Sequence, residues 1–265
     1  MEQVGGLLQQ ASHTIILPAY RAEKRDFQFK ALGEAVTSAD RETEEFLARG
    51  LRALLPGSIV IGEEGSSKDP QLLQRLSEPA VWLVDPIDGT RNFIEGRPTF
   101  ASMIALLCEG ETRMSWIHDP LNGTMHVAVK GGGAWRNGRR LTLGSINADL
   151  ARMTGIVSEF ARPLQAGNAV ELLRSATGEI HPTERCAGYE YPQVADGRRD
   201  FALYWRTLPW DHVPGILLLE ESGGSVCHLD GSSYQPMEPR LGLLLCGSQA
   251  VKAKLLNLLG SVQLS

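Results

Sequence analysis

Apolar residues recur every three or four positions along the N-terminal part of the chain, from Val4 to Ile15. This spacing predicts an amphipathic helix, which Pro18 should kink or end because proline lacks a backbone N–H. A second helix is predicted over residues 40–55, where apolar residues again repeat at helical spacing and Ser38 is the candidate cap. Two helices are therefore expected before the first strand.

Short apolar runs follow, and their pattern is typical of strands. Residues 58–62 and 80–85 are predicted to form buried strands, and both runs lead directly into acidic residues. Residues 99–135 alternate short strands with turns, and the Asn-Gly pairs that begin at positions 122 and 137 are strong hairpin signals. Much of this sheet is therefore predicted to be antiparallel.

The pattern changes after residue 141, where short strands alternate with helices. The predicted strands cover residues 152–157, 201–205, 224–229 and 241–246, and the predicted helices cover residues 165–175, 186–196, 211–222 and 248–259. We therefore expect a mixed fold of the α+β / α/β class with a boundary near residue 145. Residues 1–145 would form an N-terminal α+β domain, and residues 146–265 a C-terminal α/β domain.

Composition and charge narrow the classes of function. The chain has 265 residues, 43% of them hydrophobic and 22% charged, and its net charge is -5. This balance is typical of a globular protein and provides no basic field that would recruit nucleic acid. No segment approaches the roughly 20 apolar residues of a membrane helix, and the N-terminus lacks the pattern of a signal peptide. Four cysteines lie far apart without a zinc-binding spacing, so we expect reduced thiols and a cytoplasmic protein.

Acidic residues gather where the predicted strands end. Asp85 and Asp88 flank a proline directly after a strand, the pair Glu63-Glu64 follows the preceding strand, and Asp211 lies at the start of a predicted helix. Taken singly, these are a capped turn, a solvated loop and a helix cap. Taken together, clustered carboxylates without organised His or Cys partners favour Mg²⁺, with Mn²⁺ as the alternative, because carboxylates held so close would repel one another without cations.

The same residues resemble the three metal-binding motifs of the inositol monophosphatase family. The matching segments are Gly62-Glu63-Glu64, Asp85-Pro86-Ile87-Asp88-Gly89-Thr90 with Asn92-Phe93, and Trp210-Asp211 with Gly215. The resemblance implies a layered α-β-α-β-α sandwich, a homodimer, and Mg²⁺-dependent hydrolysis of a small phosphate monoester that Li⁺ inhibits. The substrate would be inositol monophosphate or a related polyol or sugar phosphate.

The resemblance also implies which residues would hold two or three Mg²⁺ ions. Glu63, Asp85 and the carbonyl of Ile87 would hold the ion that activates the attacking water. Asp85, Asp88 and Asp211 would hold the ion near the leaving oxygen. Such a pair of cations supports in-line displacement at phosphorus, so no covalent intermediate is needed.

Catalytic and substrate-binding residues follow from the same resemblance. Glu63 and Thr90 would orient and deprotonate the water, and Asp88 completes the catalytic set. The amides of Gly89 and Thr90 would receive phosphate oxygens. The predicted substrate contacts are Ile87, Asp88, Gly89, Thr90, Arg185, Cys186, Ala187, Tyr204 and Asp211, and the secondary candidates are Lys30, Asp40 and Glu64.

Departures from the family pattern fall on the substrate side. Tyr204 stands where inositol phosphatases carry a glutamate that binds ring hydroxyls, and Arg91 replaces a smaller residue after Gly-Thr. Arg185 is either a surface arginine or a clamp on a second anion, since guanidinium binds carboxylate or phosphate with two hydrogen bonds. The sequence therefore predicts broad or shifted selectivity.

Two alternatives stay open at this stage. The same chemistry could act on a nucleotide 3′,5′-bisphosphate, fructose bisphosphate or histidinol phosphate. A catalytically silent partner-binding module would predict a damaged ligand set, and no predicted ligand is missing from the sequence.

Overall fold

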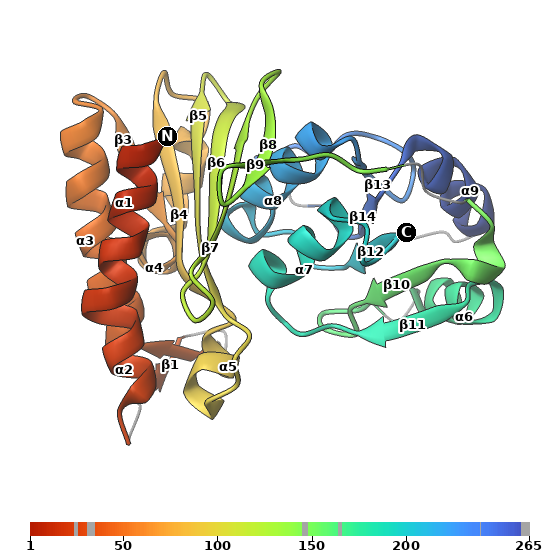
Figure 1. Ribbon diagram of the computed structural model, residues 1–265, viewed down its shortest axis with the longest axis horizontal. Helices are drawn as coiled ribbons and strands as arrows, with labels where there is room; N and C mark the ends of the chain where they lie inside the picture. The colour runs from red at the N-terminus through yellow and green to blue at the C-terminus, as the bar shows by residue number, and fades with distance from the viewer. Residues whose placement is uncertain (24–25, 31–34, 145–147, 164–165, 239, 261–265) are drawn as a thin grey trace.

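The chain folds into five layers, helix–sheet–helix–sheet–helix, as the family resemblance implied (Figure 1). The computed structural model describes residues 1–23, 26–30, 35–144, 148–163, 166–238 and 240–260. Helices α7 (Ala187–Ala195) and α8 (Pro209–Ser222) lie between the two large sheets. Helix α8 packs on the first sheet and also contacts β13 (Ser225–His228) of the second, so the two halves share this middle layer.

Within the described residues, the first sheet has seven strands in chain order, and only its first pair is parallel. Asn-Gly turns connect β6 to β7 and β8 to β9, which confirms the antiparallel hairpins predicted from the sequence. The short strand β9 was not predicted. The strands are β3 (Ile59–Gly62), β4 (Val81–Asp88), β5 (Ala101–Cys108), β6 (Glu111–Asp119), β7 (Thr124–Val129), β8 (Gly133–Arg136) and β9 (Arg139–Leu141).

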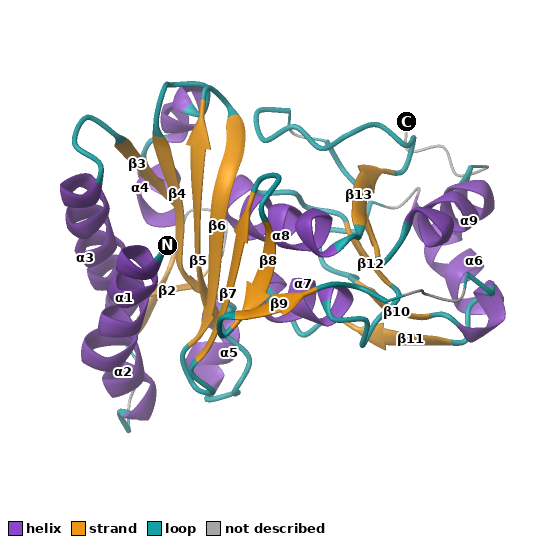
Figure 2. Ribbon diagram, turned by 45° about the horizontal axis from the view of Figure 1, so that its top comes forward, coloured by secondary structure: helices purple, strands orange, loops and turns teal. Residues whose placement is uncertain are grey.

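Helices α1 (Glu2–Ala11), α2 (Leu17–Arg21) and α3 (Ser38–Leu54) cover the outer face of this sheet (Figure 2). The helix does not end at Pro18; a π-helical segment, Ser12–Ile16, interrupts it just before α2, whose first turn holds the proline, where a missing N–H is tolerated. The cap of α3 is Thr37 rather than Ser38, since the Thr37 hydroxyl accepts from the backbone of Asp40.

The alternation of side chains along β4 determines which side of the sheet its acidic residues face. Trp82 and Val84 pack against the outer helices, whereas Leu83 packs in the same apolar cluster as Trp210 of α8. Because successive side chains of a strand face opposite sides, Asp85 faces the middle layer. The pairing of β4 with β5 shifts register between Asp85 and Asp88, so the second acid is re-aimed at the end of the strand.

The second sheet has five strands in the order β11-β10-β12-β14-β13. Helices α6 (Gly167–Ala176) and α9 (Gln249–Leu259) cover its outer face (Figure 1). The edge strand β11 was not predicted. The strands are β10 (Thr154–Val157), β11 (Glu179–Pro182), β12 (Phe201–Tyr204), β13 (Ser225–His228) and β14 (Leu243–Cys246).

Several short elements complete the described part of the chain. Helix α4 (Glu63–Lys68) continues from β3 and α5 (Thr90–Glu95) from β4, while β1 (Phe27–Phe29) pairs antiparallel with β2 (Ala35–Thr37). Two 3₁₀ turns cover Pro70–Arg75 and Leu150–Arg152. The boundary expected near residue 145 falls at residues 145–147, outside the described part of the chain. None of the described helices is both long and apolar enough to cross a membrane.

Candidate active site

A cavity of about 540 Å³ is lined by residues from both halves of the chain. All of the predicted metal ligands and substrate contacts line it, whereas the three secondary candidates, Lys30, Asp40 and Glu64, are not among its lining residues. The predicted residues that line the cavity are Glu63, Asp85, Ile87, Asp88, Gly89, Thr90, Arg185, Cys186, Ala187, Tyr204 and Asp211.

Three carboxylates converge on one point of this cavity. Asp85, Asp88 and Asp211 each place an oxygen within 4.8 Å of the others, and the first two are buried. Burial and the neighbouring carboxylates of Glu63 and Asp88 raise the pKa of Asp85 well above its usual range. Burial and the carboxylates of Asp88 and Glu63 likewise raise the pKa of Asp211. The cluster therefore resists carrying its full negative charge without a cation.

The donor set fits a hard divalent cation. The Oδ1 atom of Asp85 is buried and makes no hydrogen bond within the described part of the chain. A buried carboxylate oxygen without a partner is costly unless a donor or a cation meets it. The three converging carboxylates supply oxygen ligands alone, which is the preference of Mg²⁺ and Mn²⁺ rather than zinc.

Asp88 is fixed by the start of α7. Its Oδ2 atom accepts a hydrogen bond of 2.6 Å from the amide of Gly188, and the thiol of Cys186 lies 3.6 Å from its carbonyl oxygen. Burial raises the pKa of Asp88 to about 6, and the hydrogen bond from Gly188 limits the rise. This contact explains why Cys186 and Ala187 line the same cavity as the acids.

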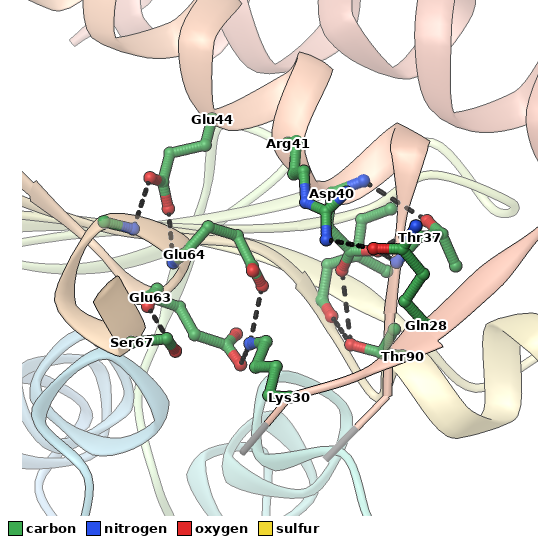
Figure 3. Close-up of polar contacts among 12 residues, drawn as sticks. Gln28, Lys30, Thr37, Asp40, Arg41, Glu44, Glu63, Glu64, Ser67 and Thr90 are labelled. Atoms are coloured by element: carbon green, nitrogen blue, oxygen red, sulfur yellow. Dashed lines mark hydrogen bonds and ion pairs between the residues drawn. The ribbon is translucent and has the colours of Figure 1, made fainter. Parts of the chain in front are cut away.

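Lys30 joins the two glutamates that follow β3 (Figure 3). Its Nζ atom lies 2.7 Å from Oε1 of Glu63 and 2.7 Å from Oε1 of Glu64. Burial lowers the pKa of Lys30, but Glu63 and Glu64 outweigh this effect and raise it above its ordinary value. Among the three secondary candidates, Lys30 therefore contacts the predicted metal ligand Glu63 directly, and Glu64 shares the same lysine.

Glu44 of α3 is a residue that sequence reasoning missed. Its carboxylate accepts hydrogen bonds from the amides of Glu64 at 2.8 Å and Gly65 at 2.9 Å, so it satisfies the first turn of α4 from outside the helix (Figure 3). A Cβ atom on Gly62 would lie 2.1 Å from Glu44 Oε2, so only glycine permits this approach. Burial raises the pKa of Glu44 to about 7, although the two amides lower it.

Asp40, the third secondary candidate, contacts the predicted catalytic hydroxyl. Thr90 Oγ1 lies 3.2 Å from Asp40 Oδ1 and 2.9 Å from the carbonyl oxygen of Ile87. The other oxygen of Asp40 accepts from the amide and the hydroxyl of Thr37. Burial raises the pKa of Asp40 to about 7. The structure thus pairs Thr90 with Asp40, and Glu63 with Lys30.

Tyr204 does not stand alone on the substrate side. Its hydroxyl donates to Oε2 of Glu190, whose other oxygen accepts from the amide of Glu184 and, at 2.7 Å, from the hydroxyl of Thr183. Burial raises the pKa of Glu190 to about 7, and these donors limit the rise. This buried carboxylate could not be predicted from the sequence pattern, because a glutamate in a helix is normally exposed.

Arg185 lies at the exposed edge of the cavity in a backbone conformation that is uncommon for residues other than glycine, with φ of 56°. Its amide donates to the hydroxyl of Thr183 at 2.9 Å. The side-chain amide of Asn92 donates to the carbonyl oxygens of Thr99 and Glu184, which ties this loop to α5. The geometry agrees with a lining arginine rather than one remote from the site.

Several lining residues carry no motif and were missed. They come from β1, from the loop after β10, from the segment between β12 and α8 and from the first turn of α8, and they add aromatic side chains and one arginine to the lining. These residues are Phe27, Phe29, Phe160, Trp205, Arg206 and His212.

Comparisons with known proteins agree with this geometry. A family model described as the inositol monophosphatase family matches residues 3–263. The chain is 31% identical over 228 residues to a Thermotoga maritima protein named fructose-1,6-bisphosphatase/inositol-1-monophosphatase, a match that covers 85% of this chain and 83% of that protein. It is 32% identical over 210 residues to a histidinol-phosphatase of Chlorobaculum parvum, with coverage of 79% and 77%. A solved structure of a Thermotoga maritima IMPase matches with a TM-score of 0.81 at 26% identity, covering 97% of this chain and 95% of that one.

Proposed function

Because the chain belongs to the inositol monophosphatase family and is a phosphatase of small phosphorylated substrates, we propose that it hydrolyses a phosphate monoester with the help of Mg²⁺. The observation that carries this proposal is the convergence of Asp85, Asp88 and Asp211 within 4.8 Å, with a buried oxygen of Asp85 left without a hydrogen bond in the described structure. Polyol and sugar monophosphates are the first candidate substrates. Bisphosphates and histidinol phosphate are the alternatives, because the relatives' names include them.

The ligand roles are proposed as the sequence motifs suggest. Glu63, Asp85 and the carbonyl of Ile87 would hold one ion, and Asp85, Asp88 and Asp211 a second. When bound, the ions would supply Lewis acidity that lowers the pKa of a water molecule and neutralises charge on the transferred phosphoryl group. Lys30 would hold two neighbouring carboxylates together near the site, because it contacts both Glu63 and Glu64.

Thr90 is proposed to orient the attacking water together with Glu63. The contact with Asp40 supports this role, because a Thr90 hydroxyl that donates to Asp40 has lone pairs left to accept a hydrogen bond from the water. The pKa of about 7 for Asp40 suits proton exchange near neutral pH. The amides of Gly89 and Thr90, at the start of α5, would receive phosphate oxygens.

We also retain three proposals about the whole protein. It would be a homodimer, it would be inhibited by Li⁺, and its chain would divide into residues 1–145, which carry most metal ligands, and residues 146–265, which supply Asp211 and the substrate contacts. Sedimentation and a Li⁺ titration of activity test the first two directly.

The experiment that tests the proposed function is a phosphate-release screen. Inositol 1-phosphate, glycerol 2-phosphate, fructose 1,6-bisphosphate, adenosine 3′,5′-bisphosphate and histidinol phosphate would be assayed with Mg²⁺ and after exhaustive chelation. We expect turnover that depends on Mg²⁺ with at least one of these esters. Turnover that survives chelation would contradict the metal assignment.

A further inference from the structure

Aromatic side chains form part of the outer wall of the cavity. Six large apolar side chains are exposed within the described residues, and three of them line this cavity. These three are Phe27, Phe29 and Phe160, which are 47%, 70% and 49% exposed, and they are the aromatic members of the set. Exposed phenylalanines gathered at one cavity mark a ligand-contact surface, since isolated exposed apolar residues are scattered.

The rings are held in place by the protein itself. Phe27 and Phe29 are two apart on β1, so they share a face, and their rings meet edge to face with centroids 5.4 Å apart. Phe160 donates its amide to Ser158 Oγ at 3.2 Å, and the guanidinium of Arg206 lies 4.8 Å from its ring centroid. The ring pair on β1 and the ring of Phe160 are therefore already positioned in the ligand-free protein.

Basic side chains accompany these rings. Arg185, Arg206 and Arg91 line the same cavity. Arg91 is paired at 2.9 Å with Glu95, which also lines the cavity, and Arg206 lies 3.8 Å from the carboxylate of Asp211. Guanidinium groups bind carboxylate or phosphate with two hydrogen bonds and also stack on aromatic faces. Three acids of the cavity, Asp85, Asp88 and Asp211, converge on one point, whereas Glu95 lies beside Arg91. The lining thus combines exposed aromatic surface with the guanidinium group of Arg185.

We infer that the outer half of the cavity is a subsite for a planar aromatic ring and a second negative group of the substrate. This inference rests on the proposed function and deepens it: among phosphate monoesters, those that carry a planar ring and a second negative group, as nucleotide-like esters do, would bind more tightly than a bare polyol phosphate. A cavity of about 540 Å³ lies within the range of about 300–1,000 Å³ that holds drug-sized ligands, so there is room for a ring beside the phosphate.

Two phosphonates test the ring subsite without any turnover. Benzylphosphonate and cyclohexylmethylphosphonate differ in the aromaticity of one ring, and calorimetry in the presence of Mg²⁺ gives their affinities. We expect the aromatic ligand to bind about two- to tenfold more tightly, as edge or face contacts between aromatic rings predict. Phe29→Leu and Phe160→Leu should reduce this ratio toward one. Met237→Leu, at an exposed residue that does not line the cavity, is the control and should keep the wild-type ratio.

The second negative group is tested with 4-carboxybenzylphosphonate. Arg185→Ala should weaken its binding about tenfold more than that of benzylphosphonate, because one charge-assisted contact is lost. Arg152→Ala, at an exposed arginine outside the cavity, should affect both ligands equally. Equal affinities for the two ring phosphonates, unchanged by Phe29→Leu and Phe160→Leu, would overturn the subsite.

The binding assay also separates this inference from the proposed function. An aromatic preference in binding with no Mg²⁺-dependent phosphate release from any ester would keep the subsite and reject the phosphatase chemistry. Phosphate release with no aromatic preference in binding would keep the phosphatase chemistry and reject the subsite.

Discussion

The two ends of the cavity are built in opposite ways. At the inner end, Asp88 is bound by the amide of Gly188 and Asp40 by the amide and hydroxyl of Thr37, so each carboxylate is directed by the backbone or a neighbouring side chain. At the outer end, Phe29 is 70% exposed and Arg185 lies at an exposed edge. The inner end is preorganised for one chemistry, whereas the outer end can vary with the substrate.

This difference explains how a phosphatase family can share chemistry and differ in substrate. Changes at the inner end remove a ligand or leave a buried charge without a partner, and both are costly. Changes at the outer end alter exposed side chains, which usually has little effect on stability. Substitutions at the two ends should therefore separate loss of activity from change of selectivity.

The largest effect is expected at the inner end. Asp88→Asn should abolish measurable phosphate release, because one ligand charge is lost where three carboxylates converge. The melting temperature should change little, since the amide oxygen can still accept from Gly188. Asp69→Asn, at an exposed acid outside the cavity, is the matched control. Full activity of Asp88→Asn would reject the metal assignment.

The second largest effect on activity is expected for Thr90→Ala. If the hydroxyl orients the attacking water, kcat should fall by about two orders of magnitude or more, a typical loss for a positioned proton-transfer group, with a smaller change in KM. Thr90→Ser keeps the hydroxyl and should retain most of the activity. Normal kcat with a much higher KM in the alanine variant would make Thr90 a phosphate-binding residue only.

Glu44 offers a test of indirect support for the acids. Glu44→Gln replaces one accepting oxygen by an NH₂ group that must face the amide of Glu64 or Gly65, so the first turn of α4 should lose its anchor. The Mg²⁺ concentration needed for half-maximal activity should rise about 10- to 100-fold, as for other residues that orient metal ligands. The neighbouring exposed Glu45→Gln should leave it unchanged. A fall in melting temperature without any change in Mg²⁺ requirement would make Glu44 purely structural.

The same contrast separates what could be predicted from the sequence. The inner acids lie in short local motifs, where Asp85, Asp88 and Thr90 follow one another along a single strand end. The outer wall joins Phe27 to Phe160, which only the tertiary fold brings to the same cavity, and neither has a motif. Local spacing therefore predicted Asp85 and Asp88. The aromatic residues could not be predicted, because only the tertiary fold brings them to one cavity.

Local patterning also fails where burial departs from residue type. Glu190 is buried within α7, although glutamate in a helix is normally exposed, so no pattern marks it. The edge strand β11 has no continuous apolar run, because its residues are exposed or half-buried. Its pairing with β10 is what defines it as a strand.

Two carboxylates next to the inner end, those of Asp40 and Glu44, should also make the metal-free protein sensitive to pH. Burial raises the pKa values of Asp40 and Glu44 to about 7, above the ordinary value of about 4 for such groups, so the folded state binds more protons than the unfolded state between these limits. Stability must then fall as pH rises from about 4 to 7 and stay low above it. In chelator, the melting temperature should be a few degrees higher at pH 6 than at pH 8, and Mg²⁺ should narrow this gap. A metal-free protein that is more stable at pH 8 would contradict the raised pKa values.

The smallest effect is expected for Tyr204. Its hydroxyl is committed to Glu190, and as a neutral phenol it cannot replace the ionised acceptor that a glutamate offers to ring hydroxyls. Tyr204→Phe should therefore change the ratio of kcat/KM for inositol 1-phosphate and glycerol 2-phosphate by less than about threefold. It should lower the free energy of unfolding by about 1–3 kcal/mol, because Glu190 loses a donor in a buried site. Tyr191→Phe, which removes a buried hydroxyl that does not line the cavity, is the matched control for the ratio. A tenfold loss of inositol 1-phosphate preference in Tyr204→Phe alone would mean that the phenol binds the substrate after all, and that the inner and outer ends are coupled through Glu190.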